Sequence, residues 1–298
     1  MKKTRPKVSV CIPVYNNTTY IQETVRSILN QTYKDFEIII IDDGSPDEST
    51  WELVSAFQEP VKAFKQKNQG IAGAKNACVE KASGEYIAFC DHDDLWEPDK
   101  LEKQVKILDE NGEIGFVFTG FTRFNKKEGE IKTLSQKIDS RDVFASLLKK
   151  SYIYTSTLLI RRSLWNKAGG YNTTFTLADD LEFHLRLAYN AKPYCLSEPL
   201  MLYRLHTSNT SRSSASKAKY PYELERIYTY WLSVENLTAA QRKCLKKRLG
   251  KCYFDMAKLA IEKSDKPKYM KLLKKAVKED RLNRRYLLRF LRAFLGLS

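Results

Sequence analysis

The stretch that most constrains the fold is a short apolar run that ends abruptly in acidic residues. The run Tyr86–Cys90 has the length and residue types of a buried β-strand, and Asp91, Asp93 and Asp94 follow it directly. Carboxylates at the mouth of a buried strand lose hydration and repel one another, so the pattern predicts a positive partner among them. Hard divalent cations suit this place because they accept one or two carboxylates and share phosphate oxygens. The alternative is that Asp91 and Asp93 only cap a helix expected over 99–108.

A second acidic pair follows another apolar run. The segment 36–41 shows no polar alternation, as expected of a central parallel strand covered on both faces, and it leads into Asp42 and Asp43. Strand-like runs at 7–14, 36–41, 61–65 and 86–90 alternate with helical spacing at 19–29, 49–57 and 70–81. This alternation predicts an α/β fold with a Rossmann-like, mostly parallel sheet flanked by helices. Ligands bind such sheets at the carboxyl ends of the strands, where both acidic pairs fall.

The middle of the chain continues the mixed pattern less regularly. Strands are expected at 115–121, 155–160 and 193–204, and helices at 142–149, 161–168 and 176–189. The polar stretch 126–140 predicts an exposed hairpin or loop, and the Ser/Thr-rich stretch 207–219 predicts a mobile loop or linker. From residue 221 onward the apolar residues recur at helical spacing.

Positive charge is concentrated in the last part of the chain. Residues 213–298 hold 22 Lys and Arg against 8 Asp and Glu, a net charge of +14, whereas residues 1–212 hold 29 against 28, a net of +1. The composition therefore predicts two parts, a catalytic domain over 1–212 and a basic helical region over 213–298. The basic region points to a polyanionic surface or partner, and the nearly neutral first part is a poor candidate for binding nucleic acid.

The last helix expected has two contrasting faces. Its apolar residues share one face and its arginines the opposite one: Leu287, Leu288, Leu291, Phe294 and Leu295 against Arg285, Arg289 and Arg292. A helix lying in the surface of an anionic membrane has this arrangement. Two alternatives are that the apolar face packs on the preceding helices or forms a contact in a homo-oligomer.

Targeting and membrane-spanning signals are not evident in the sequence. No apolar stretch follows Met1–Lys7, and the longest apolar runs, such as Ile38–Ile41, fall far short of the roughly 18 residues that span a bilayer. We therefore expect a cytoplasmic protein, peripheral at the inner face of the membrane.

Eight short motifs, taken together, resemble a family 2 glycosyltransferase with the GT-A fold, of the bacterial cell-surface polysaccharide type. They are Ile12–Asn16, Ile41–Ser45, Asn68–Gly70, Asp91–Asp94, Arg161-Arg162, Gly169–Tyr171, Asp179-Asp180 and Tyr203–His206. The resemblance covers roughly residues 5–212, and the basic region lies outside it. Two positions depart from the family: Lys75 stands where Arg is common, and Asp179-Asp180 where Glu-Asp is commoner.

The resemblance implies a site for a nucleoside-diphosphate sugar, with UDP as the expected nucleotide. A loop at Pro13–Tyr15 would hold the base and ribose, Asp42 or Asp43 would accept a hydrogen bond from uracil, and Lys75 would reach the base or the diphosphate. The residues assigned to donor binding are Pro13, Val14, Tyr15, Asn16, Asp42, Asp43, Lys75, Asp91 and His92. Taken alone, Asp42-Asp43-Gly44 is also a common turn sequence.

The resemblance also implies a metal and a general base. Asp93, with Asp91 as second choice, would bind Mn²⁺ or Mg²⁺ bridging the two phosphates, and His206 would complete the ligand set. Asp180 would take the proton of the acceptor hydroxyl, giving one displacement with inversion. Asp179 would hold the acceptor or raise the proton affinity of Asp180, although acidic residues are also favoured at a helix N-terminus. Residues 207–212 would then order over bound donor.

The function predicted is therefore sugar transfer to a lipid-linked or polysaccharide acceptor. A sugar-nucleotide nucleotidyltransferase shares this kind of sheet, but it would need a Gly-rich phosphate loop that Ile12–Asn17 lacks. A polyanion-binding protein acting through the basic region is a third possibility, although its acidic pairs would repel phosphate in the absence of a metal.

Overall fold

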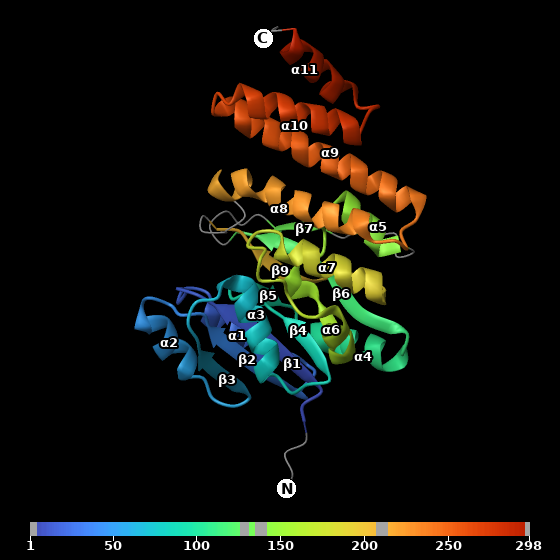
Figure 1. Cartoon of the computed structure of the whole chain (residues 1–298). Helices are drawn as coiled ribbons and strands as arrows, with labels where there is room; N and C mark the ends of the chain where they lie inside the picture. Colours follow the sequence, from blue (N-terminus) through green and yellow to red (C-terminus); the bar gives the residue numbers. More distant parts are fainter. Residues whose placement is uncertain (1–4, 126–130, 135–141, 207–213, 296–298) are drawn as a thin grey trace. The chain divides into compact units, whose positions relative to one another are not determined.

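The computed structural model describes residues 5–125, 131–134, 142–206 and 214–295 (Figure 1). Contacts divide the chain into two compact units. The sheet unit comprises Met1–Phe144 and Tyr152–His206, and the helical unit comprises Ala145–Ser151 and Thr207–Ser298. The stretch 207–213, which contains the domain boundary proposed from the sequence and the expected flap, lies outside the described residues.

The first four strands form the parallel half of the sheet. They are β1 (Val8–Val14), β2 (Phe36–Asp42), β3 (Val61–Lys65) and β4 (Tyr86–Phe89), in the order β3-β2-β1-β4. Every residue of β1 and β2 is buried, as expected of central strands covered on both faces. In the register, Val14 lies beside Asp42. The carboxyl ends of β1, β2 and β4 therefore share one edge, and the acidic pairs follow there.

The second half adds strands of both directions. These are β5 (Leu95–Trp96), β6 (Ile114–Phe124), β7 (Ile131–Leu134), β8 (Leu159–Arg161) and β9 (Lys192–Arg204). Strand β8 is antiparallel to β4 and β6, while β9 is parallel to β6 and antiparallel to β5. The nine strands within the described residues make one mixed sheet. Because β9 pairs with β5, residues 203–206 return to the acidic segment that follows β4.

Helices cover both faces of this sheet. They are α1 (Ile21–Leu29), α2 (Glu48–Ser55), α3 (Gly70–Lys81), α4 (Lys100–Glu110), α6 (Arg162–Ala168) and α7 (Asp179–Asn190), and the residues of α5 (Val143–Lys149) fall partly in each unit. Helix α3 packs on β1 and β2, and α6 packs on α7. The α/β fold with flanking helices predicted from the sequence is confirmed.

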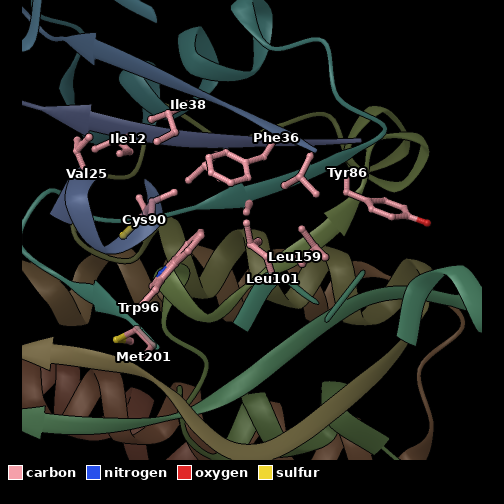
Figure 2. Close-up of a cluster of buried hydrophobic side chains, with 14 of the residues drawn as sticks. Ile12, Val25, Phe36, Ile38, Tyr86, Cys90, Trp96, Leu101, Leu159 and Met201 are labelled. Carbon is pink, nitrogen blue, oxygen red and sulfur yellow. The ribbon is translucent and has the colours of Figure 1, made fainter. Parts of the chain in front are cut away.

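The main core lies between the sheet and helices α1 and α4 (Figure 2). Alternate residues of a strand point to opposite faces, so Ile12 points to this core whereas Cys11 does not belong to it. Trp96 and Leu101, from the segment that follows β4, contribute their side chains to this core. The indole N–H of Trp96 donates to the Ser156 carbonyl at 3.0 Å, which ties the acidic segment to the second half of the sheet.

Within the described residues, the C-terminal part of the helical unit contains four successive helices. They are α8 (Ser214–Ser233), α9 (Ala239–Glu262), α10 (Lys266–Glu279) and α11 (Arg284–Phe294). Each packs against the next one along the chain. Thr238 and Gln241 form a reciprocal capping box at the start of α9, and Asp265 caps α10 just before Pro267. These signals explain why the helices begin where they do.

Helix α11 keeps its apolar face exposed. Tyr286 is its buried residue and stacks on Phe254, with ring centres 4.7 Å apart. Leu288 and Phe294 are 55% and 71% exposed. The packing of this face on the preceding helices, one of the alternatives from the sequence, is therefore not what the structure shows. Across the described residues, no helix combines the length and apolar character needed to cross a bilayer.

Two expectations for local structure are wrong. The strand expected at 155–160 is a 3₁₀ turn at Thr155–Thr157 followed by the short strand β8. The loop expected through 219 ends earlier, because α8 already begins at Ser214 and carries Pro221 inside it. Most of the polar stretch 126–140 lies outside the described residues, but 131–134 forms the edge strand β7.

Candidate active site

The loop after β1 lies at the carboxyl edge of the sheet. Pro13 and Val14 end the strand itself, and Tyr15 follows with 49% of its surface exposed. Asn16 adopts a left-handed backbone conformation (φ 48°), and its N–H donates to the Ser45 hydroxyl at 2.8 Å. The first loop is therefore anchored to the loop after β2, and the Tyr15 ring remains available to a ligand.

Asp42 and Asp43 have different partners. Asp42 Oδ1 accepts from the N–H and the hydroxyl of Ser45, at 3.0 and 2.5 Å. Asp43 Oδ1 accepts from the side-chain amide of Gln66 and the N–H of Gln69, at 2.7 and 2.9 Å. Asp42 Oδ2 is buried, with no hydrogen-bond partner among the described residues. Both carboxylates thus shape the loops at this edge, and each keeps a second oxygen outside these bonds.

Asp94 organises the segment that follows β4. Its Oδ2 accepts from the Ser156 hydroxyl at 2.6 Å, and Ser156 Oγ in turn accepts from the Asp91 N–H at 3.0 Å. Its Oδ1 accepts from the Arg204 N–H at 3.3 Å. Asp94 is fully buried, so these bonds fix the backbone that presents its two acidic neighbours. Asp94 therefore has a structural role in this segment.

Asp93 and His206 form a close pair. His206 Nε2 lies 2.7 Å from Asp93 Oδ2, and both side chains are partly exposed. The imidazole also packs against the Tyr20 ring, with centres 5.0 Å apart. The structure therefore brings together two of the three residues assigned to a metal from the sequence.

Arg204 places His206 at this site. Its guanidinium pairs with Glu23 at 2.8 Å and lies over the rings of Tyr20 and Phe124, at 4.5 and 4.7 Å from the ring centres. Its Nε donates to the Asp93 carbonyl at 2.9 Å. Arg204 was not selected as a site residue from the sequence, although it lies in one of the motifs. The feature of the sequence that could have identified Arg204 is its position two residues before His206, a candidate metal ligand.

His92 faces the first loop instead of the acidic pair. Its Nδ1 lies 3.3 Å from the Pro13 carbonyl oxygen, and its own carbonyl accepts from the Thr24 hydroxyl at 2.9 Å. Burial lowers the pKa of His92, with Asp93 acting in the opposite direction. The imidazole is therefore neutral near pH 7 and braces the loop that carries Tyr15.

Lys75 contacts the second acidic pair, Asp179 and Asp180. Its ammonium is 2.6 Å from Asp180 Oδ1 and 3.2 Å from Asp179 Oδ2, and 4.5 Å from the centre of the Tyr171 ring. The Lys75 and Asp179 side chains are 2% and 6% exposed, whereas that of Asp180 is 41% exposed. Asp180 is therefore the member of the pair that a substrate can reach.

The two acidic pairs act on one another electrostatically. Burial raises the pKa of Asp91 to about 7; Lys75 opposes this shift, whereas Asp180, Asp93 and Asp179 add to it. Burial likewise raises the pKa of Asp179 to about 6, again against Lys75. For Asp180 burial acts in the same sense, but Lys75 outweighs it and the pKa falls below its usual value. Asp180 is thus ionised at neutral pH and able to accept a proton.

His184 was missed from the sequence. It lies one turn after Asp180 on α7, is fully buried, and neither ring nitrogen has a hydrogen-bond partner among the described residues. Burial lowers its pKa to about 4, although Asp180 acts to raise it. The feature of the sequence that could have identified His184 is a polar residue at a helix position that faces the core. Histidine is common at such positions without a catalytic role.

The arrangement fits a cation that is shared with a ligand. Within the described residues, no three His, Cys, Asp or Glu side chains form a ready metal-binding set. Mg²⁺ needs fewer, because it binds through one or two carboxylates and keeps water and phosphate oxygens as its other ligands. Asp93 Oδ2 and His206 Nε2 are hydrogen-bonded to one another at 2.7 Å, so the two side chains lie close enough to bind the same ion.

Comparisons with known proteins show the family of the chain. The family model described as glycosyl transferase family 2 matches residues 9–169. TuaG of Bacillus subtilis, a glycosyltransferase named for teichuronic acid biosynthesis, is 31% identical over 258 residues, which cover 82% of this chain and 100% of that protein. A glycosyltransferase of Rickettsia conorii is 40% identical over 154 residues, 51% of this chain but only 25% of the relative's length.

A solved structure supports the fold. Staphylococcus aureus TarS (residues 1–349, in complex with UDP-GlcNAc) superposes with a TM-score of 0.72 over 92% of this chain and 81% of that one, at 19% identity. The mannosyltransferase PcManGT of Pyrobaculum calidifontis, solved in complex with GDP-Man and Mn²⁺, superposes with a TM-score of 0.59 over 98% of this chain and 85% of that one, at 18% identity. The site motifs within 9–169 and the match along the full length of TuaG lead to one conclusion. The chain belongs to glycosyl transferase family 2, and it is a glycosyltransferase with the GT-A fold.

Proposed function

We propose that the enzyme transfers a sugar from a UDP-sugar to a hydroxyl of a lipid-linked or polysaccharide acceptor, with inversion of configuration. One observation carries this proposal. Asp91 and Asp93 after β4 and Asp179 and Asp180 on α7 belong to one electrostatic cluster that includes Lys75. A site for glycosyl transfer needs both a place for the diphosphate and an ionised base, and this cluster offers both.

The donor end is proposed at the edge formed by the loops after β1 and β2. Tyr15 offers an exposed ring for the base or ribose. Asp43, whose Oδ1 is held by Gln66 and Gln69, would accept a hydrogen bond from the base through its other oxygen. The complex of TarS with UDP-GlcNAc supports UDP as the nucleotide. The name of TuaG supports an acceptor that belongs to an anionic cell-wall polysaccharide.

Asp93 and His206 would hold Mn²⁺ or Mg²⁺, with Asp91 beside them. When bound, the ion would neutralise the negative charge that grows on the departing diphosphate. Arg204 and Asp94 keep these groups in place, because Arg204 bonds to the Asp93 carbonyl and to the Asp94 carboxylate. Without the ion, Asp91 and Asp93 would repel the diphosphate.

In the proposed reaction Asp180 removes the proton from the acceptor hydroxyl. The acceptor oxygen forms a bond to the anomeric carbon while the bond from that carbon to the diphosphate oxygen breaks, and UDP leaves with the electron pair. Lys75 keeps Asp180 ionised and oriented through the 2.6 Å contact. Asp179 and His184, on the same helix as Asp180, are both buried.

Calorimetric titration of UDP with and without Mn²⁺ tests the donor site. We expect binding that depends on the ion, loss of that dependence in Asp93→Ala, and a weakening of about tenfold or more in His206→Ala. A folded protein that binds no nucleoside diphosphate in the presence of Mn²⁺ would contradict the proposal. Binding of GDP or dTDP in preference to UDP would correct the nucleotide but keep the site.

We also propose that α11 holds the enzyme at an anionic membrane surface on the cytoplasmic side. The exposed leucines and Phe294 would enter the acyl boundary, and the arginines of the same helix would contact anionic headgroups. Residues 281–295 contain five arginines and no acidic residue, so this segment would be attracted to such a surface. An enzyme held there would meet a lipid-linked acceptor without diffusing in three dimensions.

A further inference from the structure

The helical unit contains a groove that the transfer site does not use. It has a volume of about 530 Å³ and lies among α8, α9 and α10. Its walls include Tyr222, Glu225, Tyr253, Lys268, Lys271 and Lys275. Ligand pockets in proteins are commonly roughly 300–1,000 Å³, so the groove is large enough for a small ligand or a section of a chain.

Three lysines of α10 face this groove. Lys268, Lys271 and Lys275 are separated by three and four residues, which places them along one face of the helix. All three are exposed, and none forms an ion pair within the part of the chain that the structure describes. Their charge is therefore available to an anionic ligand.

Two tyrosines give the groove an aromatic wall. The Lys268 ammonium lies 5.7 Å from the centre of the Tyr222 ring, and the Lys275 ammonium lies 4.8 Å from that of Tyr253. Tyr222 is 37% exposed, so part of its ring is open. The C–H face of a sugar ring packs well on an aromatic face, and the adjacent ammonium groups would meet an anionic substituent of that sugar.

Two carboxylates complete the lining, and their positions are fixed. Glu225 accepts from the Tyr253 hydroxyl at 3.0 Å, and Asp265 accepts from the Lys268 N–H at the start of α10, also at 3.0 Å. Each carboxylate has further acceptor capacity. The groove therefore offers cations for anionic groups and acceptors for hydroxyl groups in one place.

We propose that this groove binds an anionic saccharide chain, one that carries carboxylate or phosphate groups as well as free hydroxyls. That the bound chain is the acceptor polymer rests on the proposed function. A nucleic acid is a poorer match because its closely spaced phosphates would meet Glu225 and Asp265. A bilayer is a poorer match because the groove is concave and Tyr253 is buried in its wall.

Binding of a defined oligosaccharide tests this without any need for turnover. Tetragalacturonate, which has one carboxylate on each sugar, is titrated calorimetrically into the full chain and compared with neutral maltotetraose. We expect tetragalacturonate to bind about tenfold more tightly than maltotetraose. The variant Lys268→Gln/Lys271→Gln/Lys275→Gln should weaken its binding by about tenfold, since each exposed charge contributes a fraction of that factor.

A matched variant controls for net charge. Lys246→Gln/Lys247→Gln/Lys274→Gln removes three exposed lysines of the same unit outside the groove, and it should bind as the wild type does. Asp93→Ala should also retain binding, so failure of the donor site and failure of the groove give different results. The proposal would be overturned if both lysine variants lost binding equally, or if tetragalacturonate did not bind. It would also be overturned if the groove bound single-stranded DNA or phosphatidylglycerol vesicles more tightly than tetragalacturonate.

Discussion

The ammonium group of Lys75 lies 2.6 Å from the carboxylate of Asp180, although 105 residues separate them in the sequence. Lys75 is buried on α3, and Asp180 is the exposed member of the pair on α7. The same contact therefore joins two helices of the sheet unit and sets the ionisation of the proposed base. Stability and catalysis should respond together when it is broken.

The variant Lys75→Met should be less stable than the wild type by about 3 kcal/mol, because it leaves two carboxylates without their buried cation. Urea unfolding at pH 7 measures this. The matched control Lys65→Met breaks an exposed pair with Glu48 and should cost about 0.5 kcal/mol. Lys75 lowers the pKa of Asp180, so its loss should raise that pKa and move the acidic limb of the rate profile to higher pH. Equal costs for both variants would show that the Lys75 pair is not structural.

The variant Asp180→Asn should lose at least about a hundredfold in kcat, since an amide cannot take the acceptor proton. UDP binding in the presence of Mn²⁺ should stay as in the wild type, because Asp180 lies on the acceptor side in the proposed reaction. Asp179→Asn, at the buried neighbour, should retain more activity and mainly change the pH profile. If Asp179→Asn were the more damaging of the two for kcat, the assignment of the base would have to be reversed.

Lys100 predicts a pH-dependent contribution to stability. It is fully buried, donates to the Gln104 side chain at 2.7 Å, and lies 3.8 Å from the centre of the Trp96 ring. Burial lowers its pKa to about 7, with Cys90 acting in the opposite direction. The unfolded chain therefore binds more protons than the folded one between about pH 7 and 10.4, and the contribution of Lys100 to stability rises with pH across that window.

The difference in unfolding free energy between wild type and Lys100→Met isolates this effect. The unfolding free energy of the wild type, relative to that of Lys100→Met, should increase by on the order of 3 kcal/mol from pH 6.5 to pH 10. Lys106→Met, on the exposed side of the same helix, should show a difference that does not vary with pH. A flat difference for Lys100→Met as well would mean that the lysine is charged throughout.

The variant Leu288→Gln/Leu291→Gln/Phe294→Gln should bind phosphatidylglycerol vesicles at least about tenfold more weakly than the wild type, because three exposed apolar side chains no longer enter the bilayer. Its thermal unfolding should be unchanged, since these residues pack on little in the helical unit. Tyr194→Gln/Tyr230→Gln/Ile261→Gln changes three exposed apolar residues elsewhere and serves as the control. Flotation with vesicles measures both, and equal binding would exclude α11 as the membrane contact.

Much of the site could be predicted from the sequence because it depends on a general rule. Parallel strands end at the same edge, so Asp42 and Asp91 could be placed near one another from their positions after apolar runs. The pairing of Lys75 could not be predicted. A lysine in a helix of small residues looks the same in sequence whether it is solvated or buried, and only its contact with Asp179 and Asp180 on another helix decides.

Other misses have similar causes. Ser156 lies in a run of Thr and Ser that favours a strand, but it forms a 3₁₀ turn because its hydroxyl bridges Asp91 and Asp94. The return of Arg204 to this edge depends on β9 pairing with β5, a contact between strands far apart in the chain. Patterns within one segment carry little information about such pairings.

The bond between Arg204 and Glu23 has a consequence for how the enzyme is made. It closes a loop of 181 residues, and the same arginine bonds to the Asp93 carbonyl and the Asp94 carboxylate. During synthesis the first four strands can leave the ribosome and pair long before Arg204 is added. The edge that carries Asp93 and His206 should then form last, in a slow step set by the closure of that long loop.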